Sequence, residues 1–384
     1  MGSAATTVQS VKTDCRWFRG TVPCTPHKQQ GVHCVEPDGS DCRLYEKRTG
    51  RILLIKLGAI GDVIRTTPLL HALRDRYPSR QIWWLTLTPE VVPAAADVVL
   101  PFTPQSMAIL QATNFDLLVN LDKDPEACAL AVTTAAGVKK GFTLKNGVPA
   151  PIDTDAEHKF LTGLFDDISR ANTKSYQQEI FEICGLTFAG EPYILDNYAA
   201  GGYSWTLPRK KKIVGLNTGC GGRWTSRLWA EKNWISLARR LRKAGHVPLL
   251  LGGEQEDAKN RRIAKTSGAL YFGHFPLRQF INLVDHCDCV VTAVTMAMHI
   301  TIGLNKKIVV FNNIFNRHEF ELYGLGEILE PDFDCPCYFS MVCPNDCMQY
   351  IEVDRVLSSV QNLLKAPGEH PARPARRTAS PRRR

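Results

Sequence analysis

Four short segments of the 384-residue chain place glycines or polar residues directly after an apolar run. They are the turn that ends at Asp62, the glycine-rich run 218–223, the segment 252–254 and the segment 295–299. Strands of α/β domains end in loops of this kind, and ligands bind at the carboxyl ends of those strands. These segments are therefore the candidate binding and catalytic loops.

The first segment has the spacing GxxGD, formed by Gly58, Gly61 and Asp62. It is not the dinucleotide fingerprint GxGxxG, whose third glycine would fall at Val63. A ligand other than a nicotinamide cofactor is therefore expected here. The alternative interpretation is that Asp62 is only an acidic residue in a first helical turn, where the helix dipole favours it.

The segments after residue 217 have the residue types of an anion site. Backbone N–H groups of the glycine-rich run 218–222 could approach an anion closely, and Arg223 and Arg227 could hold a diphosphate in forked contacts. Thr295 stands where a helix is expected to begin, which predicts a second phosphate site. Glu254, at a strand end, suits a pair of ribose hydroxyls.

Each of these residues has a simpler alternative. The glycines could form a plain surface turn, Glu254 could be a solvated loop acid, and His299 could be a satisfied core histidine. The residues taken together indicate a ligand site more strongly than any one of them, because candidate anion or hydroxyl contacts follow four different strand ends.

The chain has thirteen cysteines, and eight of them fall into two groups near its ends. The groups are Cys15, Cys24, Cys34 and Cys42, and Cys335, Cys337, Cys343 and Cys347. Without a secretion signal this pattern favours metal ligation over disulfides. His27 and His33 are substitute ligands for the first group, whose alternative interpretation is unliganded surface thiols. Spacing leaves open whether there are two metal sites or one shared site.

Apolar runs and helical periodicity alternate along the chain, which predicts parallel sheets covered on both faces. The expected strands are 52–57, 81–87, 98–100, 115–121, 213–217, 247–251, 289–292 and 307–311. The expected helices include one that follows Gly61 and contains Leu69, Leu70, Leu73 and Tyr77, and others at 125–136, 234–245, 256–266, 277–285 and 295–303. The fold class is α/β, with two doubly wound domains that face each other across a cleft.

The expected domain organisation has five parts. They are a Cys-rich segment with a predicted metal site (1–48), a first Rossmann-like domain (49–205), a second Rossmann-like domain (206–332), a Cys cluster with a closing helix (333–366) and a disordered basic tail (367–384). The tail carries six arginines against Glu369, so it holds about half of the net charge of +9. A solvated end is preferred to a binding segment.

Composition excludes several classes of protein. No run of eighteen apolar residues suggests a membrane span, and the polar segment 1–5 lacks the core of a signal peptide, which predicts a cytoplasmic protein. No nucleic acid is expected as a partner, because the basic residues concentrate in the tail and no aromatic-basic face is evident. Peripheral contact with the inner membrane and an oligomeric state are both compatible with the sequence.

Over roughly residues 51–365 the chain resembles the bacterial heptosyltransferases, the ADP-heptose-type glycosyltransferases of GT family 9 with the GT-B fold. The resemblance, to a branch with cysteine clusters, rests on the segments 55–63, 67–68, 215–219, 250–254, 295–299 and 321–324, with Trp224, Arg227 and Trp229. It implies that Asp62 is the catalytic base and that Gly58 and Gly61 belong to the acceptor-side loop. It also implies that the second domain binds the donor diphosphate. The combined candidate donor contacts are Thr218, Gly219, Arg223, Arg227, Glu254, Thr295, Met296 and His299.

Some members of that branch bind iron or zinc through their cysteines, which implies a structural zinc or iron here. No DxD pair marks a catalytic cation, so none is expected to be required. The chain departs from the family at Arg227, where lysine is usual, and at Val294, where an acidic residue usually contacts the donor sugar. Val294 leaves the identity of the sugar open.

The leading hypothesis is an inverting glycosyltransferase that moves a heptose from ADP-heptose to a hydroxyl acceptor, such as lipopolysaccharide core or another glycan. The alternatives are a non-catalytic sugar-nucleotide-binding protein, a protein or natural-product glycosyltransferase with another donor, and a nucleic-acid-binding metalloprotein.

Overall fold

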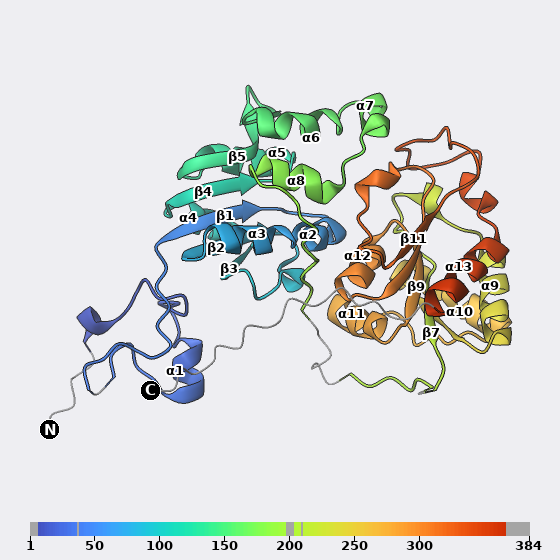
Figure 1. The fold of residues 1–384 in the computed structure, drawn as a ribbon, viewed down its shortest axis with the longest axis horizontal. Coiled ribbons are helices and arrows are strands. Elements are labelled where there is room, and N and C mark those ends of the chain that lie inside the picture. Colours follow the sequence, from blue (N-terminus) through green and yellow to red (C-terminus); the bar gives the residue numbers. More distant parts are fainter. Residues whose placement is uncertain (1–6, 37, 197–202, 209, 366–384) are drawn as a thin grey trace.

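The protein folds into two α/β units and an N-terminal segment, in a computed structural model that describes residues 7–36, 38–196, 203–208 and 210–365 (Figure 1). The predicted basic tail and part of the predicted linker lie outside the described residues. Helices cover the sheets of both units, and the N-terminal segment lies beside the first unit, away from the second.

The first unit is a six-stranded sheet with the order β3-β2-β1-β4-β5-β6. Its strands are β1 (Gly50–Ile55), β2 (Arg80–Thr86), β3 (Val98–Pro101), β4 (Phe115–Asn120), β5 (Ala136–Lys145) and β6 (Val148–Pro151). All neighbours pair in parallel except β5 and β6. The order reverses between β1 and β4, so the loops after these two strands border the crevice where such sheets bind ligands.

The predicted burial of the first strand on both faces is confirmed. Ile52 and Leu54 belong to one apolar cluster, whereas Leu53 and Ile55 belong to another. Successive side chains of a strand point to opposite faces, so both faces of β1 are covered. The helices of this unit are α2 (Ile60–Thr66), α3 (Leu69–Arg76), α4 (Pro104–Gln111), α5 (Pro125–Thr133), α6 (Glu157–Leu161), α7 (Asp166–Ala171) and α8 (Tyr176–Ile183).

Two predictions in this unit are wrong in detail. The expected single helix after the glycines is the pair α2 and α3, which separate at Pro68. The helix expected over 125–136 ends at Thr133, and the hairpin of β5 and β6 was not predicted. Asn146 and Gly147, both with positive φ, turn this hairpin. An Asn-Gly pair between two strands is a recognised hairpin signal.

The second unit is a five-stranded sheet with the order β11-β10-β9-β7-β8. Its strands are β7 (Ile213–Asn217), β8 (Val247–Leu251), β9 (Cys289–Ala293), β10 (Lys307–Phe311) and β11 (Gly326–Leu329), all paired in parallel. Its helices are α9 (Glu231–Lys243), α10 (Asp257–Ser267), α11 (Leu277–Asp285), α12 (Met296–Gly303) and α13 (Val353–Lys365). The order reverses at β7 and β9, which the glycine-rich loop and Thr295 follow.

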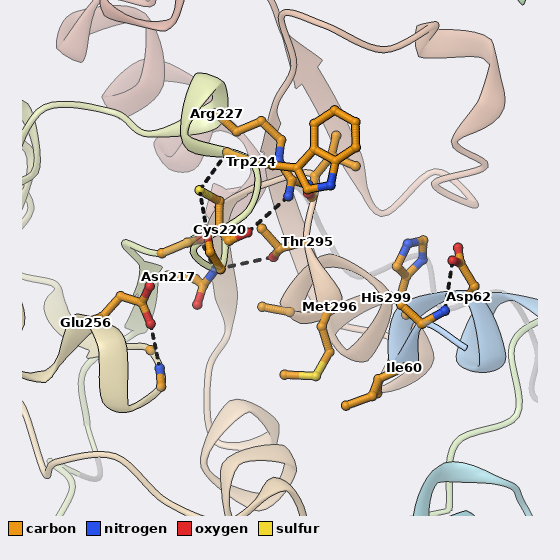
Figure 2. A pocket seen from close by; sticks show the side chains of 18 of the residues that line it. Ile60, Asp62, Asn217, Cys220, Trp224, Arg227, Glu256, Thr295, Met296 and His299 are labelled. Atoms are coloured by element: carbon orange, nitrogen blue, oxygen red, sulfur yellow. Dashed lines mark hydrogen bonds between the residues drawn. The ribbon is translucent and has the colours of Figure 1, made fainter. Parts of the chain in front are cut away.

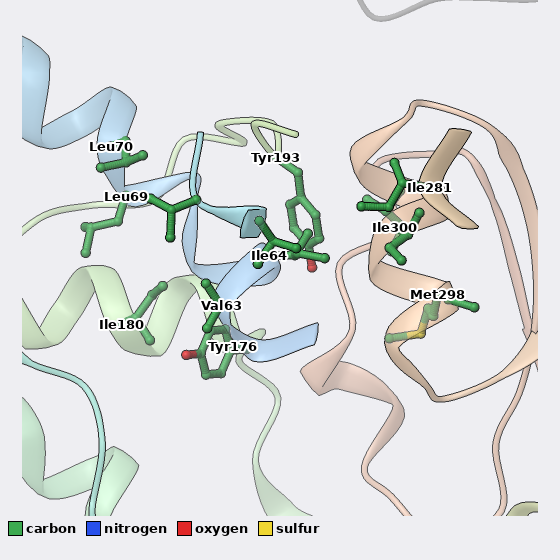
Figure 3. Packing of buried hydrophobic residues seen from close by; sticks show 14 of the residues in the cluster. Val63, Ile64, Leu69, Leu70, Tyr176, Ile180, Tyr193, Ile281, Met298 and Ile300 are labelled. Carbon is green, nitrogen blue, oxygen red and sulfur yellow. The ribbon is translucent and has the colours of Figure 1, made fainter. Parts of the chain in front are cut away.

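Helices α2 and α12 pack against each other where the two units meet. One apolar cluster includes Val63 and Ile64 of α2 together with Met298 and Ile300 of α12 (Figure 3). The close approach depends on Gly61, because a Cβ there would lie 2.6 Å from His299 Cδ2. The glycine of the GxxGD motif therefore serves domain packing as well as the turn.

The N-terminal segment contains α1 (Thr25–Gln30) and is joined to the first unit by ionic contacts. Arg16 Nε lies 2.9 Å from Asp97 Oδ1, and Arg19 donates a hydrogen bond to the Asp97 carbonyl. Within the described part of the chain, no helix has both the length and the apolar character that a membrane span requires.

Candidate active site

A cleft of about 870 Å³ lies between the two units and receives loops from both (Figure 2). Eight of the predicted site residues line it: Gly61, Asp62, Gly219, Arg227, Glu254, Thr295, Met296 and His299. The other three do not. Gly58 is outside the lining, Arg223 lies beside the Trp224 ring, and the Thr218 hydroxyl donates to Asn260 within the protein.

Asp62 lies in the first turn of α2 with its carboxylate held at both oxygens. Oδ1 is 2.8 Å from Arg65 Nε, and Oδ2 accepts a hydrogen bond from the Ala59 N–H at 3.2 Å. The side chain is nevertheless 32% exposed, so a ligand in the cleft can reach it. A carboxylate that is oriented and still accessible has the geometry of a general base.

Charge around Asp62 keeps the carboxylate ionised. Burial alone would raise the pKa of Asp62, but Arg65, Lys56 and His299 oppose it and lower the pKa to about 2. Lys56 is itself buried and ion-paired with Asp122, which follows β4. The two strand ends at the switch point of the first sheet thus contribute a linked set of charges.

Arg65 is the main site residue that the sequence interpretation missed. It lines the cleft, contacts Asp62, and reaches the second unit, where its Nη1 lies 3.0 Å from Glu319 Oε1. Its guanidinium also lies 3.8 Å from the centre of the Tyr176 ring. The i,i+3 spacing of Asp62 and Arg65 was a usable signal. No local signal could have indicated Glu319, which is 254 residues away.

The loop after β7 forms the opposite wall of the cleft. Backbone N–H groups of residues 219–222 donate to no backbone carbonyl among the described residues. Thr295 precedes the first residue of α12, and its hydroxyl lies 3.3 Å from Asn217 Nδ2 and 3.0 Å from Thr292 Oγ1. Unused amides beside a helix N-terminus are suited to an anion.

Arg227 places a cation at the same wall. Its guanidinium donates to the carbonyls of Val294 and Cys220, and its Nε has no hydrogen-bond partner in the described structure. Burial lowers the pKa of Arg227, and no carboxylate contributes to the charge around it. Arginine stays protonated even so. The cleft therefore contains a largely buried positive charge without a protein counter-ion.

Two further polar residues near this wall were not predicted. Glu256 lines the cleft, and its carboxylate accepts a hydrogen bond from the Gly253 N–H at 3.0 Å. It packs so closely on Gly219 that a Cβ there would lie 2.2 Å from it. Lys259 donates to the Thr218 carbonyl at 2.8 Å. A side chain at position 219 would therefore require the Glu256 side chain to move.

His299 is buried where α2 and α12 meet. Its Nδ1 lies 3.3 Å from the Tyr193 hydroxyl. Burial and the charge of Arg65 lower the pKa of His299 to about 3. A neutral, partnered imidazole at this contact agrees with the alternative interpretation of a core histidine, although its ring also faces the cleft.

The second cysteine group forms a compact cluster. The sulfur atoms of Cys335, Cys343 and Cys347 lie within 4.8 Å of one another, and all three side chains are buried. Cys337 is half-buried and packs at the edge of this cluster. These cysteines can hold a metal ion.

The first cysteine group is separate and more open. Cys15, Cys24, Cys34 and Cys42 line one cavity of about 270 Å³, together with His27 and His33. Among the described residues, the only group of three or more metal-ligating side chains with converging ligand atoms is the one at 335–347. The two groups lie apart, so a single shared metal is not compatible with this structure. The metal site predicted for the first group stays a prediction.

Comparisons with known proteins were made for sequence and for structure. Residues 191–318 match the model of glycosyltransferase family 9 (heptosyltransferase). No curated protein sequence matches the chain.

Solved structures resemble the whole two-unit body at low sequence identity. A glycosyl transferase family 9 protein from Veillonella parvula has a TM-score of 0.61 at 16% identity, covering 83% of this chain and 98% of that one. Escherichia coli ADP-heptose lipopolysaccharide heptosyltransferase II has a TM-score of 0.59 at 15% identity, covering 82% and 98%. The iron-containing dodecameric glycosyltransferase TibC of enterotoxigenic E. coli has a TM-score of 0.54 at 13% identity, covering 83% and 80%.

At these identities the structural likeness concerns the fold, and it confirms the expected GT-B arrangement of two facing α/β units. The family match lies on the unit that contains Arg227, Glu254 and Thr295. Residues 191–318 therefore match the model of a glycosyltransferase family, and the two units together have the GT-B fold.

Proposed function

We propose that the protein is an inverting transferase that moves a sugar from a nucleoside diphosphate donor to a hydroxyl acceptor. One observation carries the proposal. An accessible carboxylate of the first unit, Asp62, and a guanidinium of the second unit without a carboxylate partner, Arg227, line the same cleft. The first suits the proton of an acceptor, and the second suits the charge of a leaving diphosphate.

In the proposed reaction the acceptor hydroxyl gives its proton to Asp62 while its oxygen attacks the anomeric carbon. The bond between this carbon and the donor phosphate oxygen breaks, and the nucleoside diphosphate leaves with the electron pair. Asp62 is ionised throughout the neutral pH range, because its pKa is about 2. So weak a base takes the proton late, once the hydroxyl has become acidic in the transition state.

The second unit would stabilise the leaving group. Negative charge grows on the diphosphate as the bond breaks, and fixed donors aimed at developing charge lower the barrier. We assign this role to Arg227, the amides of Gly219 and its neighbours, and the N-terminus of α12 after Thr295. Glu254, which opens a short 3-10 helix after β8, is assigned to the ribose hydroxyls.

The proposed donor is ADP-heptose, and the proposed acceptor is lipopolysaccharide core or another glycan. Support comes from structures of similar fold: an E. coli heptosyltransferase, WaaC, with ADP, and TibC in complex with ADP-D-β-D-heptose. In this chain Val294 contributes an apolar side chain to the cleft where the family usually has an acid. Contacts to the sugar must therefore differ from those of the family.

The test uses the full chain with Asp62→Asn, which keeps the shape of the side chain and removes its basicity. We expect transfer from ADP-heptose to fall by about a hundred- to ten-thousand-fold, the usual contribution of a general base. ADP binding, followed by calorimetry, should remain. Full transfer by the variant would contradict the assignment of Asp62.

A second measurement tests the donor. Nucleoside diphosphate sugars with different bases and sugars are compared by thermal shift, because a bound donor stabilises by mass action. ADP-heptose should give the largest shift. A larger shift with a uridine or guanosine nucleotide would overturn the choice of donor and would favour the alternative of a glycosyltransferase with another donor.

A further inference from the structure

The segment 335–347, here called the thiol loop, places three cysteines at the distances of a metal site. Cys335 Sγ and Cys343 Sγ are 3.8 Å apart. Two thiolates on one tetrahedral zinc, each at about 2.3 Å, would be separated by about 3.8 Å. The donor set therefore fits a zinc or iron ion, with Cys337 at its edge as the nearest fourth thiol.

The thiol loop also supports the residue that carries the cleft's unpaired positive charge. Arg227 is the last residue of the 3-10 helix η5 (Thr225–Arg227). Ser226 N–H donates to the Met341 carbonyl at 3.0 Å, and Ser226 Oγ donates to the Ser340 carbonyl at 2.7 Å. Thr225 Oγ1 also donates to the Met341 carbonyl. Both acceptor carbonyls belong to the stretch between Cys337 and Cys343.

Aromatic packing reinforces this link. Phe339 of the thiol loop meets Trp224 edge-to-face at 5.3 Å and Phe315 at 5.7 Å between ring centres. The Arg227 guanidinium lies 5.7 Å from the centre of the Trp224 ring and 5.6 Å from that of Phe315. Phe339, Trp224 and Phe315 all line the cleft. The wall behind Arg227 is thus built partly from the thiol loop.

The same loop touches the first unit. The Tyr338 hydroxyl lies 2.8 Å from Ser169 Oγ, and the guanidinium of Arg170 lies 4.1 Å from the centre of the Tyr338 ring. Both partners belong to α7. The conformation of the thiol loop therefore affects the donor wall and one of the contacts between the two units.

We propose that a metal ion bound by Cys335, Cys343 and Cys347 positions Arg227 through Ser226 and Phe339, so that metal occupancy sets the affinity of the cleft for a nucleoside diphosphate. This inference rests on the proposed role of Arg227 in donor binding. Without the metal, the stretch 338–342 loses its metal-bound anchors on both sides, and ordering it again costs conformational entropy. This cost reduces the net free energy of ADP binding.

The main experiment measures ADP affinity of the full chain by calorimetry before and after the metal is removed with a chelator, and again after reloading with Zn²⁺ or Fe²⁺. We expect ADP to bind about 5- to 150-fold more weakly without metal, the usual range of coupling between two sites, and to recover on reloading. Unchanged ADP affinity in the stripped, folded protein would overturn the proposal.

Reciprocity provides a second, independent readout of the coupling. If metal strengthens ADP binding by a given factor, ADP must strengthen Zn²⁺ binding by the same factor. Zn²⁺ affinity is therefore measured by competition with a chromophoric chelator, with and without ADP. Equal Zn²⁺ affinities in the two conditions would contradict the coupling, and circular dichroism checks that the metal-free protein is folded in both.

Two variants separate this inference from the proposed function. Ser226→Ala removes one link while leaving the thiols intact, so it should bind metal normally and ADP several-fold more weakly. Ser359→Ala, which removes a hydrogen bond to Glu327 elsewhere in the same unit, is the matched control and should leave ADP affinity unchanged.

Arg227→Ala tests the premise itself. If this variant binds ADP as tightly as the natural chain, the proposed donor role of Arg227 is wrong. If Arg227→Ala weakens binding while metal removal and Ser226→Ala do not, the donor role stands and only the metal coupling is wrong.

Discussion

Charged side chains are paired differently on the two sides of the cleft. On the first unit the charged groups are paired: Asp62 with Arg65, Arg65 with Glu319 across the cleft, and Lys56 with Asp122. On the second unit, the hydrogen bonds of Arg227 go only to carbonyl oxygens. A paired carboxylate has its orientation set before any ligand binds, whereas a buried cation without a counter-ion gains most when an anion arrives.

This difference suggests a division of work. In the proposed reaction the first unit orients a base and holds it ionised, and the second receives negative charge. Disturbing the first side should therefore change the pH dependence of turnover, and disturbing the second should change the binding of the diphosphate.

The largest effect on ADP affinity is expected from Arg227→Ala in the second unit. Hydrogen bonds to a charged group contribute about 1.5–3 kcal/mol, so ADP affinity should fall by about ten- to a hundred-fold. Arg227→Lys, which keeps the charge without the planar fork, should lose less. Calorimetry measures both, and an equal loss in the two variants would show that the forked geometry, and not the charge, is what matters.

Arg65→Gln tests the first side. Burial raises the pKa of Asp62 and Arg65 is the largest influence that lowers it, so the variant should move this pKa up from about 2. The acid limb of the pH profile of kcat/KM should then shift to higher pH, into the measurable range. Glu319→Gln is the control, because it keeps the pair of Asp62 and Arg65 and removes only the contact with the second unit. An acid limb that moves equally in both variants would assign the effect to the inter-unit contact.

Gly61→Ala should disturb the place where the two sides meet. The added Cβ would lie 2.6 Å from the His299 ring, so α2 and α12 must separate. Overpacking of this kind costs about 1–3 kcal/mol of unfolding free energy, which denaturant titration can measure. Gly58→Ala is the comparison, since the nearest atom to its Cβ is 3.9 Å away. Equal losses in the two variants would argue against the packing role of Gly61.

The last prediction concerns the pH dependence of stability through His299. Its folded-state pKa of about 3 lies below the ordinary value of 6.5, so the unfolded chain binds more protons between these values. Neutral His299 contributes to the free energy of unfolding. This contribution is fully present above pH 6.5 and is lost as pH falls toward 3, by up to about 1.4 kcal/mol per pH unit. His299→Gln should flatten this dependence, whereas substitution of the exposed His318 should not. A stability curve unchanged by His299→Gln would contradict the neutral, buried state.

Much of the fold could be predicted because its signals are local. The buried run 52–55 and the four strands of the second sheet that were predicted have apolar stretches bounded by glycine or polar residues. The β5–β6 hairpin was missed because its first strand mixes lysines and glycines with few apolar residues, although Asn146 and Gly147 carried a turn signal. Of the predicted site residues that follow strand ends, Gly219, Glu254 and Thr295 line the cleft, whereas Thr218, directly after β7, turns inward to Asn260.

The sequence by itself determined which loops would border the cleft, because the carboxyl ends of parallel strands meet at one edge of a sheet. It also determined that cysteines gather near both ends. Only the tertiary structure decided which charges meet across the cleft, that the two cysteine groups lie apart, and that the thiol loop supports Arg227. These contacts join residues far apart in the chain, such as Arg65 with Glu319 and Ser226 with Ser340. Their geometry depends on how two folded units pack, which no local pattern of residues encodes.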